Sequence, residues 1–141
     1  MMLKVIIFLV VIIAIVYFLI RNGKAKTILF KSILTGDKTV PPNLSAAIGT
    51  ATLVFNKETK VCAIIVNYSK TLEAVSAHIH KGAVGVSGPI VIRLDHTQNP
   101  IKFTSKPLTA QQEADLKANL YYIDIGTERL PKGEIRGQLV Y

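Results

Sequence analysis

The sequence predicts an all-β domain behind an N-terminal transmembrane helix. The domain is expected to be an antiparallel, Greek-key-like sandwich or flattened barrel of about eight strands with one short helix. Three observations lead to this prediction. Residues 5–20 form an uninterrupted apolar run. From residue 27 onward, short apolar or alternating runs recur between turn residues. A single helix-capping signature, near residue 109, interrupts these runs.

The apolar run is long enough to cross a bilayer. A membrane-spanning helix needs about 20 apolar residues, and residues 1–20 reach that length if Lys4 extends to the interface. A secretory signal peptide is the alternative, but the run exceeds the usual apolar length of roughly 7–15 residues. Residues 21–26 also contain no Ala-x-Ala cleavage site. We therefore predict a transmembrane helix over 1–20, a basic juxtamembrane linker over 21–29 and a folded domain over 30–141.

The net charge of +8 is concentrated next to this run. From residue 32 onward, twelve Lys and Arg face nine Asp and Glu. The excess cations, including Arg21, Lys24 and Lys26, are expected at the surface of a lipid bilayer, near anionic head groups. Trp is absent, and there is no Arg-rich stripe with interleaved aromatic residues. We expect no nucleic-acid partner.

Eight segments have the composition of strands, with breaks that carry Gly, Pro, Asn or Asp. Residues 50–55 alternate between Thr or Val and an apolar side chain, which is typical of a sheet with one buried face. The predicted strands are Thr27–Leu34, Ile48–Asn56, Lys60–Tyr68, Val75–His80, Pro89–Leu94, Ile101–Thr104, Tyr121–Ile125 and Glu134–Tyr141.

One helix is predicted over about 110–119. Thr109 followed three positions later by Gln112 is a capping box, in which each residue satisfies a backbone N–H of the other. Leu116 and Leu120 then form an i, i+4 apolar pair. The helix is expected to cover one end of the sheet structure.

His78 and His80 are two apart on a predicted strand, so their imidazoles share a face. Imidazole is a common metal ligand, and an H-x-H pair on a strand also occurs in copper/zinc superoxide dismutases. A metal site needs at least a third ligand, and the remaining histidine, His96, lies in a turn. The alternative is a hydrogen-bonded structural pair.

Three sequence blocks together resemble the CHRD family, whose domain was first described in chordin. They are Ala77–Gly82 continuing to Ser87–Ile92, Gly133–Leu139, and Pro41-Pro42 after Leu34-Thr35-Gly36. The resemblance spans roughly residues 30–141 and implies a domain that is often extracellular; most members have no established biochemical function. The positions that it marks as family motif are His78, His80, Gly88, Pro89, Glu134, Arg136 and Gly137.

The chain departs from that family at one position that matters for metal binding. CHRD-like sequences commonly carry a histidine in the penultimate strand, in a pattern close to Tyr-x-Asn-x-His-Thr. Here the corresponding stretch, residues 122–127, has Gly126 in its place. We therefore favour a structural role for His78 and His80, with no metal and no other cofactor, and keep a metal site as the alternative.

Glu134 and Arg136 also share a strand face by spacing. A catalytic interpretation makes Glu134 a base and Arg136 an anion clamp; a structural one makes them an ion pair or a clamp on the backbone. A lone carboxylate without a nucleophile or second carboxylate is a poor catalytic set. The sequence also lacks a phosphate-binding glycine loop, a G-x-S-x-G elbow and a C-x-x-C pair. We expect no enzyme activity.

Two further features bear on chemistry and partners. Cys62, the single cysteine, lies in an apolar strand, cannot form an intramolecular disulfide and is expected to be buried. The glycine-rich segment 81–88 joins strand to strand, and exposed loops on a rigid scaffold are where partners bind.

The side of the membrane is predicted from charge. Arg21, Lys24, Lys26 and Lys31 follow the apolar run, which by the positive-inside rule places the domain on the cytosolic side. Two glycosylation sequons, at Asn43 and Asn67, and the CHRD resemblance favour an extracellular domain.

Together these features predict a non-enzymatic, membrane-anchored binding or scaffolding protein with protein partners in a larger assembly. It could tether a membrane to a protein layer such as a viral capsid around an internal membrane. Thirteen Lys against four Arg indicates an AT-rich genome, as in large DNA viruses. The alternatives are a membrane-tethered metalloprotein with dismutase-like chemistry and an extracellular ligand-binding module.

Overall fold

The computed structural model describes residues 6–7, 10–14 and 26–141. Within those residues, no helix has both the length and the apolar composition needed to span a bilayer. The transmembrane helix predicted over 1–20 lies outside the described residues except at 6–7 and 10–14, which are helical. Most of the linker predicted over 21–29 lies outside them as well.

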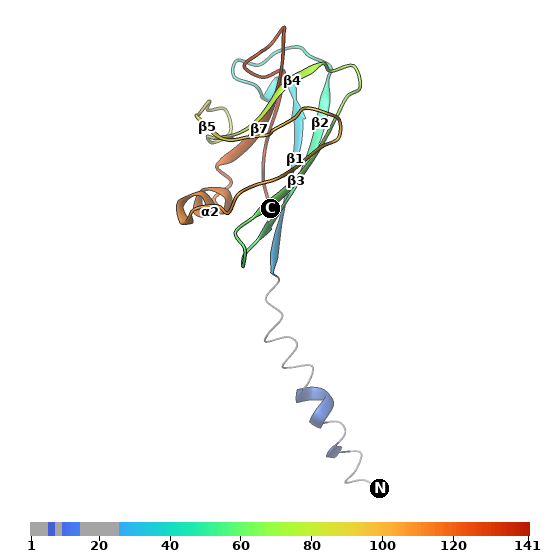
Figure 1. Ribbon diagram of the computed structural model, residues 1–141, viewed down its shortest axis with the longest axis vertical. Coiled ribbons are helices and arrows are strands. Elements are labelled where there is room, and N and C mark those ends of the chain that lie inside the picture. The colour runs from blue at the N-terminus through green and yellow to red at the C-terminus, as the bar shows by residue number, and fades with distance from the viewer. Residues whose placement is uncertain (1–5, 8–9, 15–25) are drawn as a thin grey trace.

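Eight antiparallel strands and one short α-helix form the domain, which confirms the all-β prediction (Figure 1). The helix, α2 (Ala110–Lys117), lies at one end of the sheet, and a 3-10 turn, η1 (Gly36–Lys38), follows the first strand. The strands are β1 (Thr27–Thr35), β2 (Ile48–Asn56), β3 (Cys62–Tyr68), β4 (Ala74–Lys81), β5 (Ile90–Arg93), β6 (Ile101–Thr104), β7 (Tyr121–Thr127) and β8 (Ile135–Gln138).

All eight strands belong to one sheet, in the order β5-β4-β7-β8-β1-β2-β3-β6. The prediction left open a sandwich or a flattened barrel; the structure has a single sheet curled around its core. The weakest seam of this sheet is between β8 and β1, which share the Thr35–Arg136 pair and an isolated bridge from Lys31 to Val140. The connections β3–β4, β5–β6 and β6–β7 cross between the two halves of the sheet.

The core lies on the inner face of the curled sheet, because buried and exposed residues alternate along the strands. In β2, residues 49, 51, 53 and 55 are buried while 48, 50, 52 and 54 are exposed. The two halves of the sheet contribute to one hydrophobic cluster, with Phe30, Leu53 and Ile64 from one half and Ile79 and Ile123 from the other. Leu116 of α2 closes one end of this cluster.

Several strand ends differ from the prediction by one to three residues, and two of these differences have a clear local reason. The third strand begins at Cys62 rather than Lys60, because Lys60 has a positive φ of 63° in the turn after β2. The last strand ends at Gln138, after which Val140 exchanges two backbone hydrogen bonds with Lys31 of β1. The predicted capping box is present: the Thr109 hydroxyl accepts from the Gln112 N–H, and the Gln112 side chain accepts from the Thr109 N–H.

Candidate functional site

Three of the family-motif residues, His78, His80 and Arg136, lie on one outer face that is formed by the neighbouring strands β4, β7 and β8. Pairing across these strands forms two rows of side chains. One row places His78 opposite Asp124 and Asp124 opposite Arg136. The next row places His80 opposite Tyr122 and Tyr122 opposite Gln138. Since the intervening residues face the core, the register alone brings the six polar side chains together.

A loop, residues 82–88, folds back over this outer face and buries most of it. Arg136 donates from Nη2 to the carbonyl oxygens of Ala83 (3.0 Å) and Val86 (2.9 Å). Gln138 donates from Nε2 to the carbonyl of Gly82 at 2.9 Å. These side chains satisfy loop carbonyls that would otherwise lie over the sheet without partners, so they fix the path of the loop.

Tyr122 connects the loop to both histidine and arginine. Its ring stacks on that of His80, with centroids 4.9 Å apart and planes within 3°. The guanidinium carbon of Arg136 is 3.4 Å from the centre of the same ring, which is a cation–π contact. The Tyr122 hydroxyl accepts from the backbone N–H of Gly88 at 3.0 Å. One aromatic ring therefore anchors the end of the loop and packs against two side chains of the cluster.

The His80 ring is oriented by the loop. Its Nδ1 donates to the Gly88 carbonyl at 2.9 Å, which leaves Nε2 facing the carboxylate of Asp124, 3.0 Å from Oδ2. Asp124 is 6% exposed, and its other oxygen, Oδ1, has no hydrogen-bond partner in the described structure. Burial raises the pKa of Asp124, while the nearby His80 and Arg136 act in the opposite direction. The buried Asp124 carboxylate and the His80 imidazole are stable next to each other when they share a proton or bind a cation.

His78 lies beside this pair. Its Nδ1 is 3.8 Å from Asp124 Oδ1, and its Nε2 is 3.2 Å from Nη1 of the exposed Arg93. Burial, with His80 and Arg93 nearby, lowers the pKa of His78, so the neutral imidazole is favoured. A neutral His78 that accepts from Arg93 at Nε2 carries its proton on Nδ1.

Tyr122, Asp124 and Gln138 are the residues of this cluster that the sequence analysis missed. The loss of a histidine at Gly126 suggested that the His78/His80 pair lacks a third ligand, whereas the structure places a carboxylate next to both imidazoles. A signal was present in the sequence: Tyr122 and Asp124 alternate with Ile123 and Ile125 in a strand. A charged residue that alternates with core residues in a strand points to the opposite face, where the histidines also lie.

Gly126 itself lies close to other backbone. A Cβ at this position would be 2.4 Å from the Ser76 hydroxyl oxygen and 2.9 Å from the Pro131 carbonyl oxygen. A histidine does not fit there unless the 131 turn moves. Gly126 therefore allows that turn to pack closely against β7.

Gly88 and Gly137 are required by close packing. A Cβ on Gly88 would be 1.6 Å from the Lys81 carbonyl oxygen, and one on Gly137 would be 2.2 Å from the Ser32 hydroxyl oxygen. Pro89 follows Gly88 in the sequence. Its carbonyl accepts from the Lys81 N–H at 3.0 Å, and this hydrogen bond begins the β4–β5 pairing. Gly88 thus allows the loop to contact the sheet, and Gly137 allows β8 to approach β1 at their seam.

Glu134 does not pair with Arg136. It precedes β8, and its Oε1 accepts from Arg129 Nη2 at 2.8 Å. Its backbone carbonyl accepts from the side-chain amide of Asn43 at 2.9 Å. The i, i+2 spacing predicted a shared face, but Glu134 and Arg136 belong to two separate hydrogen-bond networks.

The remaining sequence candidates lie away from the cluster. His96 has its Nε2 3.0 Å from the carbonyl of Lys102. Cys62 is buried, and burial raises the pKa of its thiol to about 11. Of the predicted membrane-surface cations, Arg21 and Lys24 lie outside the described residues, and Lys26 is exposed, 3.5 Å from Glu58.

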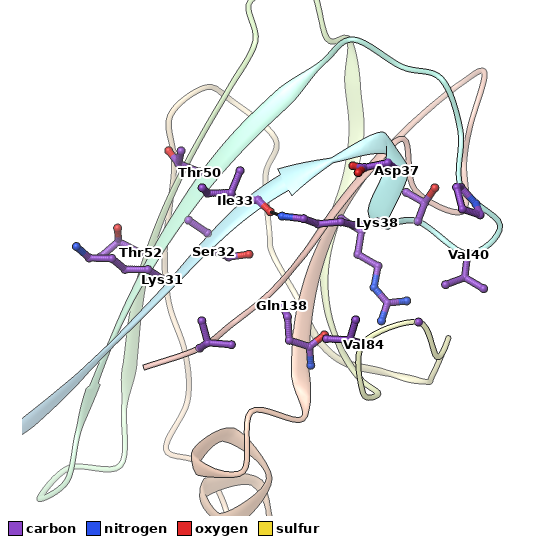
Figure 2. Close-up of a pocket in the computed structure, with 16 residues that line it drawn as sticks. Lys31, Ser32, Ile33, Asp37, Lys38, Val40, Thr50, Thr52, Val84 and Gln138 are labelled. Atoms are coloured by element: carbon purple, nitrogen blue, oxygen red, sulfur yellow. Dashed lines mark hydrogen bonds between the residues drawn. The ribbon is translucent and has the colours of Figure 1, made fainter.

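A groove runs along the outer face beside the loop (Figure 2). It has a volume of about 920 Å³ and lies on β1, β2 and β8. One side is formed by η1 and the chain that follows it, and the other by Val84 and Gly85. Figure 2 shows Lys31 and Thr52 at one end and Val40 and Val84 at the other. Ile33 and Val84, which are 62% and 80% exposed, give the groove an apolar lining.

Comparison with known proteins gives one match. The CHRD domain family matches residues 30–139, most of the chain and nearly all of the described domain. No curated protein and no solved structure is significantly similar to the chain.

Proposed function

The chain belongs to the CHRD domain family, and on that premise we propose that it is a non-enzymatic binding module that holds a segment of a partner protein in the groove. The observation that carries this proposal is the exposed apolar lining of the groove at Ile33, Val40, Val84 and Val140. Contiguous exposed apolar surface on a folded domain usually marks an interaction site.

The dimensions and charge of the groove favour a protein segment as the occupant. A volume of about 920 Å³ is at the upper limit for small-molecule pockets, which are roughly 300–1,000 Å³, and the groove is open along the sheet. Lys31 is exposed at one end, whereas Lys38 donates to the Ile33 carbonyl at 2.6 Å. We expect the partner to contribute apolar side chains to the centre and a carboxylate near Lys31.

The polar cluster supports a binding role rather than a catalytic one. Tyr122, Arg136 and Gln138 bind backbone groups of the 82–88 loop. Arg136 is 4% exposed, so its guanidinium has little access to a substrate anion. In the proposed function, this cluster positions Val84 at the edge of the groove.

The proposal includes tethering to a membrane. Residues 1–20 would span a bilayer and the basic residues that follow would contact lipid head groups, which leaves the domain to bind a protein layer. A capsid around an internal viral membrane is one such layer. We propose that the domain lies on the cytosolic side, as the cations after the apolar run favour.

An extracellular ligand-binding module is the second candidate, and glycosylation distinguishes it. Asn67 is exposed, but the Asn43 amide nitrogen donates to the Thr39 hydroxyl at 3.0 Å and to the Glu134 carbonyl at 2.9 Å. N-glycosylation replaces one of the two amide hydrogens, so a glycan on Asn43 would remove at least one of these bonds. We expect no glycan on either residue; a glycosidase-sensitive mass at Asn67 would support the extracellular placement.

The groove is tested by charge substitution in the full-length protein in its native membrane. Ile33→Asp and Val84→Asp place carboxylates on the apolar lining and should remove the partner from the complex recovered after mild solubilisation. Val75→Asp is the matched control, because Val75 is 53% exposed and does not line the groove. Loss of the complex in all three variants, or in none, would contradict the proposal.

A further inference from the structure

We propose that His78, His80 and Asp124 form a binding site for a divalent transition-metal cation, with Zn²⁺ as the best-fitting ion. His78, His80 and Asp124 each offer one ligand atom, and the three atoms lie within 4.8 Å of one another. In a tetrahedral zinc site, bonds of about 2.0–2.2 Å place neighbouring ligands roughly 3.3 Å apart. His80 Nε2 lies 3.0 Å from Asp124 Oδ2 and His78 Nδ1 lies 3.8 Å from Asp124 Oδ1, so each imidazole is within about half an ångström of that spacing from one carboxylate oxygen.

The atoms that would bind the cation lack other partners. His80 Nε2 and Asp124 Oδ1 are both buried without hydrogen bonds that satisfy them. Buried polar atoms in native proteins are nearly always paired, so two unpaired acceptor atoms around one point indicate a ligand. A cation between them would satisfy both atoms and compensate the buried charge of Asp124.

The surroundings of His80 fit a metal ligand. A metal-bound imidazole usually donates its other N–H to a carbonyl or carboxylate, which fixes the tautomer and the ring orientation. His80 does this through Nδ1 to the Gly88 carbonyl at 2.9 Å, and the Tyr122 ring stacked on it limits rotation. Nε2 is therefore left with a lone pair that points into the cluster.

The site is open to solvent on the side of His78. Its side chain is 19% exposed and that of His80 is 13% exposed, so a cation has a route from solvent and a water can complete the coordination. Binding at His78 Nδ1 moves the proton to Nε2, which now faces Arg93. Because Arg93 is exposed, its guanidinium is free to turn away.

The choice of metal follows from the ligands. Two imidazoles and one carboxylate suit Zn²⁺ and other late first-row divalent cations rather than Mg²⁺ or Ca²⁺, which prefer oxygen ligands. The bound cation would link β4 to β7 directly beneath the loop. Through His80 and Gly88 it would also stiffen the loop that borders the groove.

Co²⁺ titration of the full-length chain in detergent micelles tests this site, because tetrahedral Co²⁺ has a characteristic visible absorption. We expect one Co²⁺ per chain, displaced by Zn²⁺, and a rise in melting temperature with Zn²⁺. His78→Gln and Asp124→Asn should each weaken binding by about tenfold or more, as loss of ligands or of their supporting groups does. Arg93→Ala should bind at least as tightly as the unmutated chain.

His96→Gln is the matched control, since His96 is the remaining histidine and lies outside the cluster. It should leave the titration unchanged. If Asp124→Asn does not fold, the partly exposed His78 decides the result through His78→Gln. The proposal is overturned if the unmutated chain shows no saturable Co²⁺ binding, if His96→Gln weakens binding as much as His78→Gln, or if folded Asp124→Asn binds normally.

Discussion

The guanidinium of Arg136 packs against the ring of Tyr122, with its carbon 3.4 Å from the ring centre. The same guanidinium donates to two carbonyls of the 82–88 loop, and the Tyr122 hydroxyl accepts from the last residue of that loop. Two buried side chains on adjacent strands thus hold one loop at both ends. The loop path, and with it one wall of the groove, depends on this contact.

Arg136→Ala is expected to destabilise the domain. It removes two charge-assisted hydrogen bonds and a cation–π contact, and it leaves the carbonyls of Ala83 and Val86 without a donor. The expected loss is at least about 2 kcal/mol, or roughly 8 °C or more in melting temperature. Arg93→Ala, which removes an exposed guanidinium, serves as the control in a thermal melt with chelator present. Equal melting temperatures for Arg136→Ala and the unmutated chain would contradict this account.

Gly88→Ala should displace the loop. The new Cβ would lie 1.6 Å from the Lys81 carbonyl oxygen, so the backbone has to move and the hydrogen bonds to Tyr122 and His80 are lost. Gly85→Ala is the control within the same loop: its φ of +77° costs about 1–2 kcal/mol, but no atom lies within 4 Å of the new Cβ. Hydrogen exchange of the loop amides should increase in Gly88→Ala alone, and unchanged protection would rule out this packing.

Cys62 should make stability decrease at alkaline pH. Burial raises its pKa to about 11, whereas an unfolded cysteine has a pKa of about 8.5. Because the folded pKa is the higher one, the stabilisation is complete below pH ~8.5 and is lost as the pH rises towards 11. Denaturant midpoints measured across this range should fall more steeply in the unmutated chain than in Cys62→Ala. Parallel pH profiles would show that the thiol is not buried as described.

Residues 1–20 should anchor the chain in a bilayer, because an apolar segment of that length satisfies its backbone internally as a helix in lipid. Full-length protein is expected to remain in the membrane pellet after carbonate extraction. A variant with Asp at Val10 and Ile13 should be extracted, since each charge near a bilayer centre costs about 2.5–3.5 kcal/mol. Release of the unmutated chain into the supernatant would count against the anchor.

The strands and the helix could be predicted because their signals are local. Alternation in 48–56 and the Thr109–Gln112 capping box each involve residues within one element. The cluster depends instead on register between strands that are distant in sequence: Asp124 faces His78 across β4–β7, and Arg136 reaches a carbonyl 53 residues earlier in the chain. The alternation of Tyr122 and Asp124 with isoleucines indicates the face of the strand but not the strand that it pairs with, so Asp124 was missed as a neighbour of the histidines.

Glu134 shows a second reason why the sequence did not give the correct contacts of the site residues. Spacing placed Glu134 and Arg136 on one strand face, but the i, i+2 rule applies only inside a strand. β8 begins at Ile135, so Glu134 lies before the regular backbone and turns to Arg129 and Asn43. Pairing with β7 sets the start of β8 at Ile135, and for this reason Glu134 and Arg136 bind different partners.

Photo-cross-linking from position 84 tests the binding function most directly. A photoreactive amino acid replaces Val84 at the edge of the groove in the full-length protein, in its native membrane, and a second version carries it at Val75. We predict one discrete adduct with another polypeptide from position 84, abolished by Ile33→Asp, and no such adduct from position 75. Identical adducts from both positions, or none from position 84, would contradict the proposal that this groove binds a protein partner.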